Sequence, residues 1–157
     1  MRTVEKISHL AAPAPVVWNR LVTAEGINEE VRPWLTMSLP PGLSTGSLDH
    51  APVGVPLGRA WLRAFGVVPF EWDNLLLAEL DPGRRFHEIS SMITARRWEH
   101  ERTLTPIGAH QTRVHDRVVF HARRGGHGVE ALMHLLVNAV FTHRHHRLQR
   151  HFGVAPY

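Results

Sequence analysis

The segment at residues 128–151, GVEALMHLLVNAVFTHRHHRLQRH, decides how the rest of the chain can fold. Its apolar side chains recur every three or four positions, which predicts one long amphipathic helix. A run of glycines precedes the segment and Gly153 follows it, so both helix ends are marked. The predicted apolar stripe contains Leu132, Leu136, Ala139, Val140 and His143, flanked by Met133, Val137, Phe141 and Leu148.

Five apolar, strand-like segments precede this helix. They span residues 57–65, 72–80, 85–94, 97–104 and 112–122. The separators are GVVP, DPGR, the short stretch near Ala95, and TPIGAH, and each is short enough for a hairpin. We therefore expect an antiparallel meander, and the C-terminal helix is the only element long enough to cover its concave face.

The N-terminal third predicts one strand and two short helices. Residues 3–10 alternate loosely, as a strand does, and two prolines then stand where the first turn of a helix tolerates them. A second helix should start at Thr23 and end before Pro33. Residues 34–39 are expected to add a strand, and residues 40–56, rich in Pro and Gly, to form a long loop.

The composition is that of an ordinary soluble globular protein. Hydrophobic residues are 43% and charged residues 20% of 157, which suits one domain over residues 1–157. There is no Cys, no signal-peptide pattern and no apolar stretch near the ~20 residues of a membrane span, so the cytoplasm is expected. The net charge of +4 permits an anionic partner without establishing one.

The stretch at residues 96–106, RRWEHERTLTP, carries charge on both faces of a predicted strand. Side chains alternate along a strand, and the two alternating sets differ in composition. One set is Arg97, Glu99, Glu101 and Thr103, which suits solvent, and the other is Trp98, His100, Arg102 and Leu104. The large apolar side chains at the ends of the second set indicate the concave face, so His100 and Arg102 are expected to point inward.

The neighbouring strands bring carboxylates to the same face. Asp116 alternates with apolar residues and is expected opposite His100 or Arg102. The other predicted pairs are Met92–Trp98, Ser90–His100, Glu88–Arg102, Arg63–Asp73 and Trp61–Leu75. The result is a polar cluster of Glu88, His100, Arg102 and Asp116, joined by Arg59 and Asp73, inside an apolar surround. Groups so buried must satisfy one another.

Several stretches resemble a known family. They are APAPVVW, EEVRPWL, LGRAW, RRFHEIS, RRWEHER and THRHHRL. With the element order, they resemble an uncharacterised bacterial branch of the START, birch-pollen allergen and polyketide-cyclase superfamily (SRPBCC), over nearly the whole chain. The resemblance implies an α+β helix-grip fold, in which a curved antiparallel sheet wraps around a long C-terminal helix, with a ligand cavity between them.

Three roles are open for the inward polar residues: acid/base catalysis, ligand anchoring, or a structural ion-pair network. The catalytic candidates are His100, Asp116 and Glu88, because a carboxylate can orient an imidazole that moves a proton. The candidates for ligand contacts are Arg102, Trp98, Trp61, Arg59, Ser90, Met92, Phe120 and His143. Core packing is expected for at least three of the five Trp.

Metal and nucleic acid are not expected as partners. The nearest pair of His on one face of the last helix is His143 and His146, at i, i+3, and no carboxylate follows in the helix. The basic run THRHHRLQRH lacks the aromatic residues that stack on bases. No phosphate-binding glycine loop or GxSxG motif is present, so no cofactor is expected.

The favoured function is the binding of a small apolar or amphipathic molecule by a monomer or homodimer. One alternative is a cyclase or dehydratase that acts on a polyketide-like or aromatic substrate through His100 and a carboxylate. The other is an interaction module that uses the basic end of the last helix.

Overall fold

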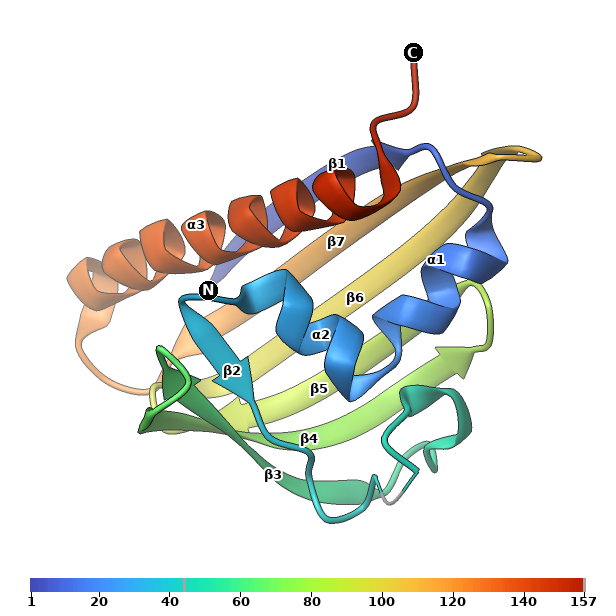
Figure 1. The fold of residues 1–157 in the computed structure, drawn as a ribbon. Coiled ribbons are helices and arrows are strands. Elements are labelled where there is room, and N and C mark those ends of the chain that lie inside the picture. The colour runs from blue at the N-terminus through green and yellow to red at the C-terminus, as the bar shows by residue number, and fades with distance from the viewer. Residues whose placement is uncertain (44, 157) are drawn as a thin grey trace.

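The computed structural model describes residues 1–43 and 45–156 as a curved sheet with a long helix across its concave face (Figure 1). The helices are α1 (Ala14–Leu21), α2 (Ala24–Val31), the short 3-10 helix η1 (Leu48–His50) and α3 (Gly126–Phe152). The strands are β1 (Arg2–Leu10), β2 (Leu35–Met37), β3 (Pro56–Ala64), β4 (Val68–Asp81), β5 (Arg85–Met92), β6 (Ala95–Gly108) and β7 (Gln111–Ala122).

The strands form one antiparallel sheet in the order β1-β7-β6-β5-β4-β3-β2. Strands β3 to β7 follow the chain as a meander, and β1 returns to pair with β7. Helix α3 packs against β1, β7 and α2, so the sheet and the helices enclose the core (Figure 1). The predicted α+β helix-grip fold is confirmed.

The two short helices cover the part of the concave face that α3 leaves open (Figure 1). The hydroxyl of Thr23 accepts a hydrogen bond from the backbone N–H of Gly26 at 3.1 Å and caps the start of α2. Asn28 ties α2 to β2, because its side chain bonds both the N–H and the carbonyl of Met37. This anchoring sets α2 over the sheet, with Glu30 2% exposed on its inner side.

Two apolar clusters fill the space between sheet and helices. The larger includes Leu10, Trp18, Leu21, Leu77, Phe86, Leu104, Val114 and Leu148. The smaller contains Val4, Val118, Phe120 and Phe141, with Trp98, Met133, Val137 and Val140 packed against it. Polar residues separate the two clusters along β1, β6 and β7: on β7, for example, Asp116 lies between Val114 and Val118.

The predicted inward faces of β5, β6 and β7 are confirmed, although one register is shifted. Ser90 pairs with Trp98 and Glu88 with His100, two residues away from the predicted pairing. The hairpin turns at residues 93 and 94 rather than around Ala95. A shift of two residues leaves every side chain on its face. Asp116 lies opposite Arg102, one of its two predicted partners.

The predictions for β3 were wrong. The observed pairs are Trp61–Trp72 and Arg63–Pro69. The register shifts between Pro56 and Gly58, where Gly58 has a φ of 102°, as a β-bulge allows. Beyond this irregularity Ala60 is fully buried, whereas Arg59 and Trp61 are exposed. Arg59 therefore lies on the outer face, where its guanidinium stacks 4.5 Å from the ring centroid of Trp72.

Helix α3 turns a different side to the sheet than its apolar periodicity predicted. Its buried residues are Glu130, Phe141, His145 and Leu148. Leu132 and Leu136 of the predicted stripe are instead more than half exposed. Contacts with the polar side chains of the sheet set this rotation, because His145 reaches Asp116.

Candidate functional site

A layer of polar side chains crosses the core between the two apolar clusters. We call it the polar belt, and it consists of Ser8, Glu30, Asp73, Glu88, Ser90, His100, Arg102, Asp116 and His145, all of them at most 9% exposed. The members come from β1, α2, β4, β5, β6, β7 and α3. Because the belt joins nearly every element, its geometry depends on the complete fold.

Asp116 is the centre of the belt. Its Oδ1 accepts hydrogen bonds from His100 Nε2 at 2.8 Å and Arg102 Nε at 2.7 Å. Its Oδ2 accepts from Arg102 Nη2 at 2.6 Å and lies 2.8 Å from His145 Nε2. Burial raises the pKa of Asp116, but the charge and hydrogen bonds of Arg102 and His100 hold it well below its usual range. The carboxylate is therefore ionised and fully occupied by its partners.

Arg102 connects Asp116 to Glu30 of α2. Its Nη1 donates to Glu30 Oε1 at 2.8 Å and its Nη2 to Glu30 Oε2 at 3.0 Å. Arg144 of α3 donates to the same Oε2 at 2.8 Å. Burial raises the pKa of Glu30, but these two guanidinium groups lower it overall. The two buried carboxylates thus share one fully buried guanidinium, and Arg144 supplies a second cation to Glu30.

The pKa values of the two histidines of the belt are shifted in opposite directions. Burial lowers the pKa of His100, but Asp116 and Glu88 raise it overall, and its Nδ1 lies 3.6 Å from Glu88 Oε1. Burial lowers the pKa of His145, whose Nδ1 lies 2.7 Å from the Ser8 hydroxyl. A neutral His145 ring fits this geometry, with Nε2–H donating to Asp116 and Nδ1 accepting from Ser8.

One end of the belt is not internally satisfied. Within the described residues, the Oδ1 of Asp73 and the Oγ of Ser90 are buried without a partner at ordinary hydrogen-bonding distance, although the Ser90 hydroxyl still interacts with the Asp73 carboxyl group. Burial and the nearby charge of Glu88 raise the pKa of Asp73 well above its usual value, and the neighbouring Ser90 hydroxyl opposes this effect only in part. The raised pKa favours the protonated form of Asp73, so a carboxyl and a hydroxyl group lie on adjacent strands, β4 and β5, with part of their hydrogen-bonding capacity unused. Such groups are uncommon in a folded core.

The Asp73→Asn variant should be more stable than the wild-type protein at pH 8, with a smaller advantage at pH 4. The pKa of the Asp73 carboxyl group is higher in the folded protein than in the unfolded chain, where it is about 3.9. Its contribution to stability is therefore fully present below the unfolded pKa and is lost as the pH rises through the folded pKa. Asn does not titrate, so the variant avoids the loss, which is about 1.4 kcal/mol for each tenfold change in the affinity of the carboxylate for its proton. Urea denaturation at both pH values measures the effect. An equal difference at pH 4 and pH 8, or the same pattern in the exposed control Asp81→Asn, would contradict it.

The structure brings most of the predicted site residues together. Arg102, Ser90, Met92 and Phe120 are buried on the inner face, and half-buried Trp98 stacks on Phe120 with ring centroids 6.1 Å apart. Trp98 Nε1 also donates to Glu88 Oε1 at 3.4 Å. Glu88 does not pair with Arg102 as expected, because the register shift sets it opposite His100.

Three predicted ligand contacts lie elsewhere. Arg59 and Trp61 point outward from β3. His143 lies on the flank of α3 and its Nε2 donates to the backbone carbonyl of Arg32 at 2.7 Å, so it joins α3 to the end of α2 instead of facing the core. Of the five Trp, Trp18 is buried in the core, and the expectation of at least three was wrong.

The sequence pattern missed Ser8 of the polar belt, and it also missed three other residues of this network, Glu30, His145 and Arg144. Glu30 lies in the polar segment EGINEEV, and the two others lie in a basic run that resembles a solvated helix end. No signal in the sequence pointed to these residues, because the predicted cluster already offered Arg102 two carboxylates, Glu88 and Asp116. Among the described residues, no group of three or more His, Asp or Glu is arranged to hold a metal ion.

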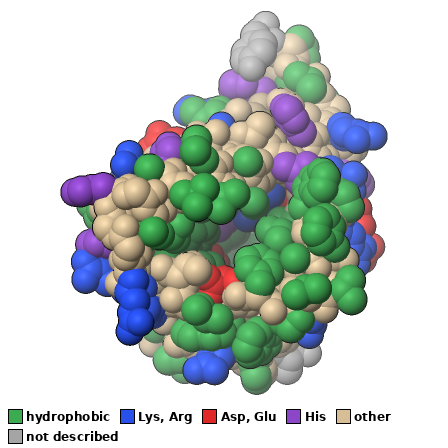
Figure 2. Space-filling view, turned by 90° about the vertical axis from the view of Figure 1, so that its left-hand side faces the viewer, with side chains coloured by type: hydrophobic (Ala, Val, Ile, Leu, Met, Phe, Trp, Pro, Cys, Tyr) green, Lys and Arg blue, Asp and Glu red, His purple; other side chains and the backbone are tan. Residues whose placement is uncertain are grey.

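The N-terminal half of α3 and the turn between β3 and β4 surround a hollow. Figure 2 shows this end of the molecule, where hydrophobic side chains gather around the opening and an acidic side chain is visible within it. The exposed apolar residues of these segments are Leu132 and Leu136 on α3, Phe65 and Val67 in the turn between β3 and β4, Val68 and Phe70 on β4, and Trp34 just before β2. Trp34 and Phe65 pack edge to face at 6.1 Å. A separate small cavity of about 40 Å³ lies between α2, β2 and the sheet and reaches Glu88.

Solved structures share this architecture at low sequence identity. Protein CV1439 from Chromobacterium violaceum is 13% identical with a TM-score of 0.72, and 99% of this chain and 100% of that chain are covered. A START superfamily protein from Mycobacterium smegmatis is 12% identical with a TM-score of 0.64, at 94% and 97% coverage. The di-domain ARO/CYC BexL from the BE-7585A biosynthetic pathway is 17% identical with a TM-score of 0.66, and 96% of this chain covers 46% of that one.

These likenesses, all at 17% identity or below, show that the chain has the helix-grip architecture that the sequence predicted. By sequence, the chain belongs to the family described as a domain of unknown function, DUF8410, whose model matches residues 8–152. Among curated proteins, none matches the chain. No helix in the described part of the chain is long and apolar enough to cross a membrane.

Proposed function

We propose that this protein binds a small apolar or amphipathic molecule between the sheet and α3. The apolar part of the ligand would lie in the hollow of Figure 2, and its polar end would reach Asp73 and Ser90. The observation that carries the proposal is that Asp73 Oδ1 and Ser90 Oγ, both buried on the inner face of the sheet, lack a partner at ordinary hydrogen-bonding distance. The raised pKa of Asp73 favours its protonated form, which donates a hydrogen bond, so we expect the polar end of the ligand to contain an acceptor such as a carbonyl oxygen.

The flank of α3 supplies one wall of this site. Residues three and four apart share a face of a helix, so Val140, Leu136 and Met133 follow one another on the flank from which His143 reaches α2. Helix α2 ends at Val31 and leaves the N-terminal half of that flank uncovered (Figure 1). Exposure of a leucine side chain to water on this flank is unfavourable by about 25 cal/mol per Å² of apolar surface. An apolar molecule that covers the flank would recover this free energy.

We assign a structural role to His100 and Asp116, in preference to catalysis. Both ring nitrogens of His100 face carboxylates, and both oxygens of Asp116 already accept hydrogen bonds. Neither group has a free atom with which to exchange a proton with a ligand. Their mutual contacts instead hold Glu88 and its neighbours in place at the inner end of the site.

Leu136→Glu should weaken the binding of the neutral dye Nile red at least tenfold, whereas Leu135→Glu should leave it within a factor of two. Both leucines are exposed, at 58% and 65%, but Leu135 lies outside the Val140–Leu136–Met133 flank. The charge on residue 136 would have to be desolvated by the bound dye. Fluorescence titration of the purified variants measures both affinities. Equal effects of the two substitutions, or no saturable binding by the wild-type protein, would refute the proposed site.

The ligand itself can be sought without a prior guess. Native mass spectrometry of freshly purified protein should show an added mass that the Leu136→Glu variant lacks and the Leu135→Glu variant keeps. Identification of that mass would also show whether it contains the expected hydrogen-bond acceptor.

A further inference from the structure

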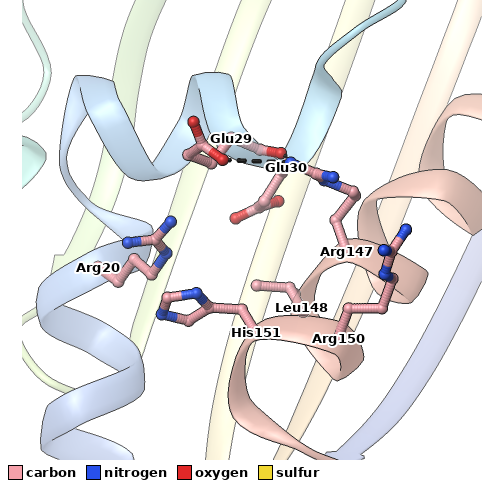
Figure 3. Close-up of a pocket in the computed structure, with 7 residues that line it drawn as sticks. All are labelled: Arg20, Glu29, Glu30, Arg147, Leu148, Arg150 and His151. Carbon is pink, nitrogen blue, oxygen red and sulfur yellow. Dashed lines mark hydrogen bonds and ion pairs between the residues drawn. The ribbon is translucent and has the colours of Figure 1, made fainter.

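A second pocket lies where α1 and α2 meet the C-terminal end of α3, and we call it the basic pocket. It has a volume of about 190 Å³ and is lined by Arg20, Glu29, Glu30, Arg147, Leu148, Arg150 and His151 (Figure 3). In Figure 3 the side chains of Arg20 and His151 lie on one side of the pocket, and those of Arg147 and Arg150 on the other. It opens at the part of α3 farthest from the hollow at the N-terminal half (Figure 1).

The two carboxylates of this pocket are already matched by cations. Glu29 accepts hydrogen bonds from Arg147 Nη2 at 3.1 Å and from Arg32 Nη1 at 3.2 Å. Glu30 is held by Arg102 and Arg144 of the polar belt and its surroundings. Neither acidic group therefore needs a further positive charge from the pocket wall.

Two arginines of the pocket are left over. In the described part of the chain, the guanidinium groups of Arg20 and Arg150 form no hydrogen bond or ion pair, and Arg20 is only partly exposed. Arginines in the last turn of a helix often bond its free carbonyls, but these two do not. Each of these two guanidinium groups has five N–H donors that remain free to bind an anion. The planar fork of a guanidinium also matches the oxygens of phosphate.

His151 adds a group that would respond to such an anion. Burial and the positive charge of Arg20 lower the pKa of His151, and Glu29 opposes this effect. The other charged groups of the pocket are Glu30, Arg147 and Arg150. A bound anion would offset the charge of Arg20, so the pKa of His151 should rise when the pocket is filled.

We propose that the basic pocket binds the phosphate group of a small molecule between the guanidinium groups of Arg20 and Arg150. A phosphate monoester has a charge of about −1.5 to −2 at pH 7, which two unpaired arginines can balance. The volume of the basic pocket equals that of roughly six water molecules at about 30 Å³ each. The pocket can therefore hold a phosphate group and part of the molecule attached to it. This inference does not depend on the apolar site, because it uses other residues at another part of α3.

Calorimetric titration with inorganic phosphate and with phenyl phosphate tests the proposal. Saturable binding is expected for at least one of them, and the affinity should fall as chloride is raised. Tighter binding of phenyl phosphate would indicate an organic phosphate ester as the ligand, whereas equal affinities would indicate free phosphate. Arg20→Gln and Arg150→Gln should each weaken binding at least tenfold.

Arg113→Gln is the control, because Arg113 is exposed on β7 away from the pocket. It should leave the affinity unchanged, and circular dichroism of every variant should match that of the wild type. Proton NMR should also show an upward shift in the pKa of His151 when phosphate is bound. Absence of binding at tens of millimolar of both probes would overturn the proposal. So would an equal loss in Arg113→Gln, which would indicate nonspecific attraction, or an unchanged pKa of His151.

Discussion

Arg102→Ala should destabilise the protein by about 3–5 kcal/mol, because it leaves two ionised carboxylates buried without their shared cation. Asp116 would retain only its histidine contacts, and Glu30 only Arg144. A domain of this size is stable by about 5–15 kcal/mol, so the variant would be close to unfolding. Urea denaturation followed by circular dichroism measures the change in the free energy of unfolding.

The matched control for this substitution is Arg117→Ala. Arg117 also comes from the inner strands of the sheet and also faces a carboxylate, Glu5, at 3.4 Å, but its side chain is 48% exposed. Exposed pairs of this kind contribute about 0–1 kcal/mol. The double variant Arg102→Ala/Asp116→Ala should lose less than the sum of the two single losses, because these residues contact each other. Equal effects at Arg102 and Arg117 would show that the belt contributes no more than a surface ion pair.

Gly26→Ala should destabilise the protein by about 1–3 kcal/mol or more, because α2 packs too closely on the end of α1 for a methyl group. A Cβ at this position would lie 1.8 Å from the backbone carbonyl oxygen of Arg20. Backbone cannot rotate away as a side chain can, so α2 must move. That movement would displace Glu30 from Arg102 and weaken the polar belt as well.

Gly128→Ala tests the same substitution where space is available. Gly128 lies in the first turns of α3, and a Cβ there would have no neighbour within 4 Å. Alanine is a better helix former than glycine, so this variant should be neutral or up to about 1 kcal/mol more stable. Thermal melting of both variants side by side makes the comparison. A Gly26→Ala protein as stable as Gly128→Ala would show that the two short helices can separate without loss.

The inner face of the meander was predictable because alternation is a local property. Trp98, His100 and Arg102 could be assigned to one face from spacing alone, and the shift of two residues in the β5–β6 register did not change that face. The same reasoning failed on β3, where the irregularity at Gly58 adds a residue. A bulge changes the phase of alternation without any change in the apolar composition, so Arg59 and Trp61 were placed on the wrong side.

The sequence by itself determined the order of elements, the antiparallel meander and the long final helix, because hydrophobic period and turn residues act over a few neighbouring positions. Only the tertiary structure decided which side of α3 faces the sheet and which partners Arg102 binds. Glu30 and Asp116 are 86 residues apart along the chain. The strong electrostatic cost of burying either carboxylate alone brings them to one guanidinium, and no local pattern records a contact of that range.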